Sequence, residues 1–116
     1  MTVTRASHLE DLLNFRRPVA EVTFDLSAFS WDSAEDLVTL QPEHIAAILD
    51  RFLAGAISET DVEAWANAIE SREDIGLLQP SPVAEAIWEL ANPLLTRPLT
   101  RQAAAALVAT LHGAAA

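Results

Sequence analysis

The sequence of 116 residues contains no cysteine, no lysine and no tyrosine, so that all seven of its basic residues are arginine. Without cysteine the chain can form no disulfide framework, no thiolate zinc site and no cysteine nucleophile. A chain of this length makes one domain, which buries enough apolar surface to fold without such support. The absence of cysteine does not determine whether the protein works in an oxidising or a reducing compartment, although it agrees more readily with a reducing cytosol.

Glycine and long apolar runs are also scarce. Only three glycines occur, Gly55, Gly76 and Gly113, and each ends or follows a predicted helix. The glycine-rich phosphate-binding patterns and the nucleophile elbow of serine hydrolases are therefore absent. No apolar run reaches the length of about 18 residues that a membrane span needs, and the amino terminus lacks the pattern of a signal peptide. We therefore expect a soluble, untargeted, cytoplasmic protein.

The residue types that bind metal ions are not arranged as ligands. The three histidines fall in three separate predicted helices: His8, His44 and His112. None forms the i, i+4 pair of a helical zinc site. Asp32, Glu35 and Asp36 lie close in sequence but lack the central glycine and final glutamate of a calcium-binding loop. The sequence therefore predicts no metal, no cofactor and no enzyme activity.

Acidic residues dominate the charged residues, with 17 acids against seven arginines and a formal net charge of −10. Since 51% of the residues are apolar, this excess does not indicate disorder. A chain this acidic is a poor candidate for binding nucleic acid or an anionic membrane, because affinity for phosphate comes mostly from lysine and arginine. Its expected partners are cationic.

The negative charge is confined to the middle of the chain. Residues 18–74 hold 13 acids and two arginines, a balance of −11, whereas residues 1–17 balance at +1 and residues 75–116 at zero. Evenly spread acids would serve solubility equally well. The asymmetry therefore indicates a located acidic surface.

The amino-terminal part predicts one short helix and one extended segment. Ser7 and Glu10 have the spacing of a capping box before an apolar face, which predicts a helix over residues 8–15 that ends before Pro18. Over residues 19–29 the apolar positions alternate with the period of a strand. Because no partner strand is evident, we predict an extended segment that lies on the core.

Two helices joined by a link of about three residues follow. Pro42 suits the first position of one helix, Gly55 ends it, and Ser58 caps the next helix with Asp61 at its N3 position. The short link predicts an antiparallel hairpin. The residues expected to face inward are Ile45, Ile48, Leu49, Phe52 and Leu53 on the first helix and Val62, Trp65, Ala66 and Ile69 on the second.

Two further helices complete the chain. Ser81 and Pro82 open one that closes before Pro93, while Thr100 caps another that ends at Gly113. The residues expected to face inward are Val83, Ala86, Ile87, Leu90 and Ala91, then Ala104, Leu107, Val108 and Leu111. With no confident sheet, these elements predict an all-α fold, a single-domain bundle of four to five helices over residues 1–116 with an extended N-terminal segment.

One edge of the helix capped by Ser58 gathers carboxylates. On a helical wheel centred on Val62, three acids lie along the border of the buried stripe, Glu59, Glu63 and Glu70, and Asp74 continues the row if the helix reaches it. Like charges four residues apart destabilise a helix, and acids near its carboxyl end oppose its dipole. We expect a cationic partner to neutralise this edge; the alternative is a solvated face. Acids of the preceding loop would form a rim: Asp32, Glu35 and Asp36.

The three tryptophans differ in their expected surroundings. Trp65 lies on the inward stripe of its helix and is predicted to be core. Trp88 stands at a helix edge and Trp31 in the acidic loop. Core packing is favoured for both, with a partly exposed binding hot spot as the alternative.

The hairpin from Ile48 to Glu63 reads ILDRFLAGAISETDVE. It resembles a sequence motif of the self-protective colicin-like immunity proteins, the group of the colicin D immunity protein. In that motif a helix ending in phenylalanine and glycine is followed by isoleucine, serine and an acidic helix. Beyond it the family continues with aromatic residues, whereas this chain has WANAI over residues 65–69.

The resemblance implies a small, acidic, cytoplasmic helical bundle that binds a toxin nuclease and covers its cationic RNA site. The residues that it implicates by position are Asp50, Glu59, Asp61 and Glu63. The sequence thus predicts a non-enzymatic protein that binds and occludes a basic partner, most concretely an immunity-type inhibitor of a bacterial nuclease toxin.

Two alternatives stay open. A structural or adaptor module would dock a partner or a second copy through its C-terminal helices, whose alanine-rich faces allow close approach. A nucleic-acid mimic aimed at a DNA-binding enzyme would share the acidic face and change the target.

Overall fold

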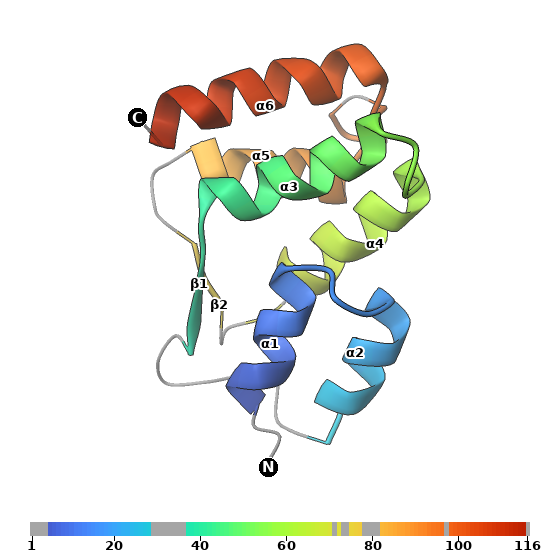
Figure 1. Cartoon of the computed structure of the whole chain (residues 1–116), viewed down its shortest axis with the longest axis vertical. Coiled ribbons are helices and arrows are strands. Elements are labelled where there is room, and N and C mark those ends of the chain that lie inside the picture. Colours follow the sequence, from blue (N-terminus) through green and yellow to red (C-terminus); the bar gives the residue numbers. More distant parts are fainter. Residues whose placement is uncertain are drawn as a thin grey trace.

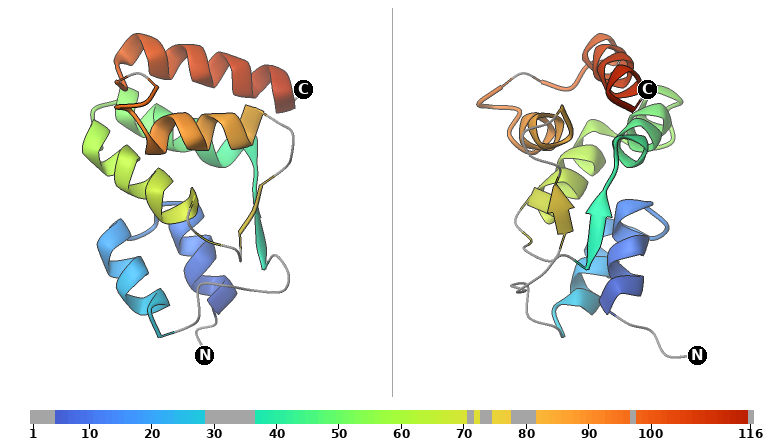
Figure 2. Two further views of the ribbon diagram at one scale, coloured as in Figure 1. Left: turned by 180° about the vertical axis from the view of Figure 1, so that it is seen from behind. Right: turned by 90° about the vertical axis from the view of Figure 1, so that its left-hand side faces the viewer.

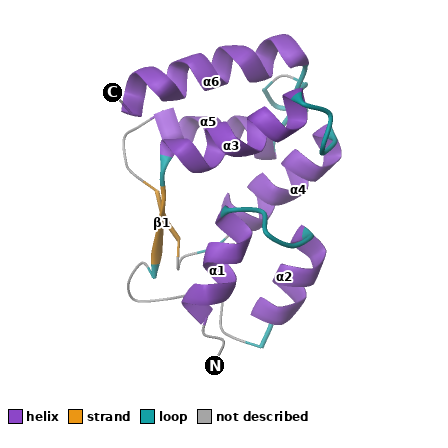
Figure 3. Cartoon of the chain, viewed as in Figure 1, coloured by secondary structure: helices purple, strands orange, loops and turns teal. Residues whose placement is uncertain are grey.

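The computed structural model describes residues 5–28, 37–70, 72, 75–77, 82–96 and 98–115 (Figure 1). These residues form helices and two short strands (Figure 3). The helices are α1 (Arg5–Leu13), α2 (Val19–Leu26), α3 (Pro42–Leu53), α4 (Glu59–Glu70), α5 (Pro82–Ala91) and α6 (Arg101–Ala115), and the strands are β1 (Val38–Leu40) and β2 (Ile75–Leu77). The prediction of a helical bundle is confirmed.

The helices form two groups that α4 connects. At one end of the molecule α1 packs against α2, and at the other end α3, α5 and α6 lie together (Figures 1 and 2). Helix α3 packs mainly against α6, whereas α4 packs mainly against α5 and also contacts α2. None of the helices in the described part of the chain combines the length and apolar character that a membrane crossing requires.

The small sheet was not predicted. Strands β1 and β2 pair in parallel, with Val38 opposite Ile75 and Leu40 opposite Leu77. Val38 and Leu40 are buried, while Thr39 between them is exposed. Each strand has only three residues, which is too short for its alternation to stand out from the flanking sequence.

The predicted extended segment over residues 19–29 is wrong, because its first eight residues form helix α2. Val22 and Leu26, one helical turn apart, are buried. Phe24, which completes the apparent alternation, is 78% exposed. Pro18 is the N-cap of α2, a position whose N–H makes no hydrogen bond within the helix, so the N–H that proline lacks is not needed. The burial is therefore that of a helix.

Helix α1 begins earlier than predicted and does not use the expected capping box. It spans Arg5–Leu13, so Ser7 and Glu10 lie within it. The carboxylate of Glu10 accepts a hydrogen bond from the side chain of Asn14, one turn later, at 3.4 Å. The turn after α1 contains Phe15, whose φ of 49° is unusual for a residue other than glycine.

The predicted boundaries between α3 and α4 are confirmed. Pro42 occupies the first turn of α3, and Gly55, with φ of 81°, ends it in the left-handed region. Ser58 and Asp61 form a reciprocal capping box: the N–H of Asp61 donates to the Ser58 hydroxyl at 3.2 Å, and the N–H of Ser58 donates to the Asp61 carboxylate at 2.9 Å.

The predicted antiparallel packing of α3 on α4 is not the main contact of either helix. The apolar stripe of α3 is covered chiefly by α6 and that of α4 chiefly by α5. After the turn at Gly55, α4 therefore runs obliquely away from α3 (Figure 1). Helices from the second half of the chain supply burial that a hairpin would otherwise have to supply itself.

Helix α6 is capped as predicted but does not stop where predicted. The hydroxyl of Thr100 accepts a hydrogen bond from the N–H of Ala103 at 3.1 Å. The helix continues through Gly113 to Ala115. One glycine costs about 1 kcal/mol relative to alanine in a helix, and Ala114 and Ala115, which follow Gly113, favour the helical conformation.

Side chains from all the helices and both strands form one buried cluster. Trp65 is among its largest members and is fully buried, as predicted. Its indole N–H donates a hydrogen bond to the carbonyl of Leu12 at 2.8 Å. This bond joins α4 to the end of α1 and fixes which face of α4 is turned inward.

Candidate functional site

The acidic edge of α4 is positioned by the burial of the opposite side of the helix. Val62, Trp65, Ala66 and Ile69 are buried, as the wheel predicts. The three predicted acids lie beside this stripe: Glu59 and Glu70 are exposed, and Glu63 is half-buried. We call Glu59, Glu63 and Glu70 the acidic edge.

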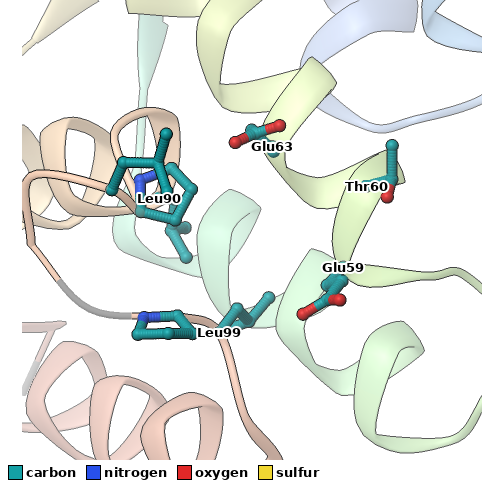
Figure 4. A pocket seen from close by; sticks show the side chains of 8 residues that line it. Glu59, Thr60, Glu63, Leu90 and Leu99 are labelled. Atoms are coloured by element: carbon teal, nitrogen blue, oxygen red, sulfur yellow. The ribbon is translucent and has the colours of Figure 1, made fainter.

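Two acids of this edge line a pocket of about 230 Å³ between α4 and the connection from α5 to α6 (Figure 4). In Figure 4, Glu59 and Glu63 extend from α4 toward the side on which Leu90 and Leu99 lie. The residues that line the pocket are Glu59, Thr60, Glu63, Leu90, Pro93, Leu94, Pro98 and Leu99. We call it the edge pocket. It pairs two carboxylates with a wall of hydrocarbon.

The described part of the chain supplies no cation to these two carboxylates. No hydrogen bond or ion pair joins the side chain of Glu59 or Glu63 to another described residue. The two glutamates are four residues apart on one helix, so their charges repel each other by a few tenths of a kcal/mol. Neutralisation from outside the chain would relieve this repulsion.

The third acid of the edge is tied to the connection after α5. The side-chain amide of Asn92 donates to Glu70 Oε2 at 3.2 Å and to the carbonyl of Trp88 at 2.8 Å. The carbonyl of Asn92 accepts the N–H groups of Leu95 and Thr96, each at 3.0 Å. Asn92 therefore fixes the position of this turn relative to the acidic edge.

The other predicted site residues take different places. The carboxylate of Asp61 accepts the N–H of Ser58 in the capping box, which gives it a structural task. Asp50 is exposed on α3. Four predicted residues lie outside the described part of the chain: Asp32, Glu35, Asp36 and Asp74. Helix α4 itself ends at Glu70.

Some acids of the negative middle segment are paired within the chain. Nη1 of Arg17 lies 3.1 Å from Glu21 and 2.7 Å from Asp25, and its Nε lies 3.3 Å from Asp11. Hydrogen bonds to Asp25 and Glu21 raise the pKa of Arg17 above its ordinary value. Glu21 and Asp25 thus form an internal network with Arg17 at α2, whereas Glu59 and Glu63 have no cationic partner among the described residues.

Exposed apolar side chains beside the edge pocket were not predicted. Leu94 is 100% exposed and Leu95 is 74% exposed in the turn after α5. Trp88 is 52% exposed, so the favoured core packing of this residue is wrong. The available signal was a pair of leucines in a stretch bounded by Pro93 and Pro98, where no helical period buries them.

The described residues contain no group of three or more His, Asp or Glu side chains that could hold a metal ion. His44 instead accepts the N–H of Gln41 through Nδ1 at 2.9 Å, at the start of α3. Comparison of the chain with family models, with curated proteins and with solved structures finds no match. The proposal for function therefore depends on the acidic edge, the edge pocket and the exposed turn.

Proposed function

We propose that the chain is a non-enzymatic acidic helical protein that binds a basic protein partner and occludes it. The most concrete form of the proposal is an immunity-type inhibitor of a nuclease toxin in the bacterial cytoplasm. The observation that carries it is the edge pocket, in which Glu59 and Glu63 stand side by side with no cation from the described residues and with an apolar wall opposite. Such a surface is complementary to a cationic protein surface, which would neutralise the two carboxylates and cover the apolar wall.

The mechanism is steric occlusion preceded by electrostatic attraction. A net charge of −10 attracts a basic surface over a distance set by the ionic strength. Carboxylates of the acidic edge then take the positions that phosphates of a nucleic acid would take on the partner. The resemblance of residues 48–63 to the colicin-like immunity proteins supports a nuclease as the partner. In this mechanism the chain needs no catalytic group of its own.

The test is the capture and kinetic analysis of the partner. The purified chain is immobilised, proteins are captured from a lysate of the source cells at low salt, and each captured protein is assayed for nuclease activity and for its inhibition by the chain. We expect a basic nuclease whose association rate constant falls at least about tenfold between about 50 mM and 500 mM salt. A rate constant independent of salt would contradict the proposal.

A matched pair of variants locates the interaction. E59Q/E63Q neutralises the edge pocket, whereas E43Q/E85Q removes the same charge from exposed positions on α3 and α5. We expect the first variant to slow association and to lower affinity, and the second to have a much smaller effect. Equal effects would show that total charge, rather than the acidic edge, determines binding.

A second function, as a structural or adaptor module, is supported by the exposed side chains of Trp88, Leu94 and Leu95. Contiguous exposed apolar side chains are typical of docking surfaces, and Leu94 and Leu95 are consecutive in the chain. In this case the chain would self-associate, or dock a partner, through the turn after α5. Sedimentation separates the two functions: an adaptor of this kind forms dimers that dissociate in L94S/L95S, whereas the inhibitor sediments as a monomer at both salt concentrations.

A further inference from the structure

The edge pocket is of the size of one side chain. Its volume of about 230 Å³ is below the range of about 300 to 1,000 Å³ that is typical of pockets for small-molecule ligands. Its chemistry is divided, since Glu59 and Glu63 stand on one wall and Leu90, Pro93 and Leu99 on the other. An occupant must therefore be long, apolar along its length and cationic at one end.

We infer that the edge pocket receives a single arginine side chain of the basic partner, with the methylene stem against Leu90 and Leu99 and the guanidinium at Glu59 and Glu63. This inference rests on the proposed function, which supplies the basic partner. Arginine and lysine both bury an apolar stem while their charged ends stay in a polar environment. The edge pocket provides both surroundings within one cavity.

Arginine fits better than lysine because of the two carboxylates. Residues four apart on a helix have their Cβ atoms about 5 to 6 Å apart, so one planar guanidinium with five N–H donors can bridge both side chains. An ammonium group is smaller, more strongly hydrated and carries three donors. Arginine is also enriched at the centres of protein interfaces, where single side chains supply much of the affinity.

The apolar wall of the pocket is held in place before binding. Leu90 is 5% exposed and belongs to the buried cluster, and Leu99 packs against that cluster. The turn that carries Pro93 and Leu94 is fixed by the hydroxyl of Thr96, which donates to the carbonyls of Glu89 at 3.0 Å and Asn92 at 2.9 Å. A preformed wall lowers the entropic cost of binding.

Two other occupants fit the observations less well. A hard metal cation such as calcium prefers six to eight oxygen ligands, whereas most of the pocket lining is hydrocarbon. A second copy of the chain would bring another net charge of −10 toward the acidic edge. The divided lining and its charge favour a cationic side chain from a basic protein.

The test is an NMR titration of the full-length chain, labelled with ¹⁵N, with four small probes at constant ionic strength. The probes are Nα-acetyl-arginine amide, Nα-acetyl-lysine amide, Nα-acetyl-norleucine amide and guanidinium chloride. We expect the arginine probe to shift the amide signals of residues 59–63 and Leu99 in a saturable way, and the lysine probe to bind more weakly. Norleucine has the stem without the charge and guanidinium the charge without the stem, so neither should saturate these signals.

Variants show whether the carboxylates are the binding groups. In E59Q/E63Q we expect the affinity for the arginine probe to fall at least about fivefold, and in E43Q/E85Q to stay within about twofold. The inference is overturned if guanidinium binds as tightly as the arginine probe, if the arginine probe shifts other signals only, or if E59Q/E63Q binds it unchanged.

The outcome for the pocket is separable from the outcome for the proposed function. If the arginine probe does not bind but the captured nuclease still depends on salt and on Glu59 and Glu63, the arginine pocket is wrong and the inhibitor function stands. If the probe binds and no basic nuclease is captured or inhibited, the function is wrong and the cavity remains a site for a cationic side chain.

Discussion

Trp65 and Leu12, which are 53 residues apart in the sequence, are joined by a hydrogen bond of 2.8 Å in the core. The carbonyl of Leu12 lies in the last turn of α1, where carbonyl groups lack the usual helical donors. It also accepts the N–H of Phe15 at 3.1 Å. The indole of Trp65 therefore helps to cap α1 and holds α4 in the rotation that turns the acidic edge outward.

Replacing Trp65 with phenylalanine should lower the free energy of unfolding by about 2 kcal/mol, because both the hydrogen bond and part of the buried ring are lost. Trp88→Phe is the control, since Trp88 is 52% exposed, and it should change stability by less than about 0.5 kcal/mol. Urea denaturation followed by far-ultraviolet circular dichroism measures both variants. Equal losses would mean that the bond to Leu12 contributes nothing specific.

Gly55→Ala should cost about 1 to 2 kcal/mol, because the φ of 81° is unfavourable for a residue with a Cβ atom. Among the described residues, no heavy atom outside its chain neighbours lies within 4 Å of the position that this Cβ would take, so backbone strain is the direct penalty that these residues impose. Gly55→Asn should cost less, since asparagine tolerates the left-handed region. The comparison is made by thermal and urea denaturation, and an alanine variant as stable as the native chain would refute the assignment of strain.

Arg17→Gln should destabilise the packing of α1 on α2, because one guanidinium serves carboxylates of both helices. Hydrogen bonds to Asp25 and Glu21 raise the pKa of Arg17, so its contribution to stability is fully present below the ordinary pKa of arginine and is lost only when the pH rises through the raised pKa. The loss in free energy of unfolding caused by Arg17→Gln should therefore shrink with added salt. Deprotonation of Arg17 should contribute nothing to that loss between about pH 6 and pH 9, because Arg17 stays protonated there. Arg16→Gln should have a smaller effect, because the side chain of Arg16 is more exposed and its one ion pair among the described residues is to Asp11.

Glu63→Gln should raise the free energy of unfolding by about 0.2 to 0.5 kcal/mol at low salt, because it removes the repulsion from Glu59 one turn earlier. Glu85→Gln should have the opposite sign, since Glu85 lies in the first turn of α5 near the positive end of the helix dipole. Urea denaturation at low and high salt measures both effects. A loss of stability in Glu63→Gln would show that the native chain already compensates this charge.

Local signals were sufficient to place the starts of α4 and α6 in the second half of the chain, although not the end of α6. Ser58 and Thr100 cap α4 and α6 as predicted, because side-chain capping bonds form within three residues. In α2 the local signal was misleading, since Val22 and Leu26 fit both a strand and a helix while the exposed Phe24 fits the strand better. Recognising α2 as a helix would also have placed Arg17 and Glu21 one turn apart.

The site was predictable on one side only. The rotation of α4 follows from the stripe that includes Val62 and Trp65, and this stripe placed Glu59 and Glu63 at the edge of the buried face. The apolar wall was not predictable, because Leu90 and Leu99 reach the pocket through the packing of α5 and the following connection against α4. No local pattern encodes that contact.

The parallel pairing of β1 with β2 has a consequence for how the chain folds. Val38 and Ile75 can meet only after the chain between them, which contains α3 and α4, has reversed its direction. Closing so long a loop costs conformational entropy, and the few hydrogen bonds between β1 and β2 can offset this cost only after the loop has closed. We therefore expect α3, the turn at Gly55 and α4 to be ordered in the folding transition state, and the strands to pair late. Substitutions at Gly55 would then slow folding, whereas substitutions at Val38 would mainly speed unfolding.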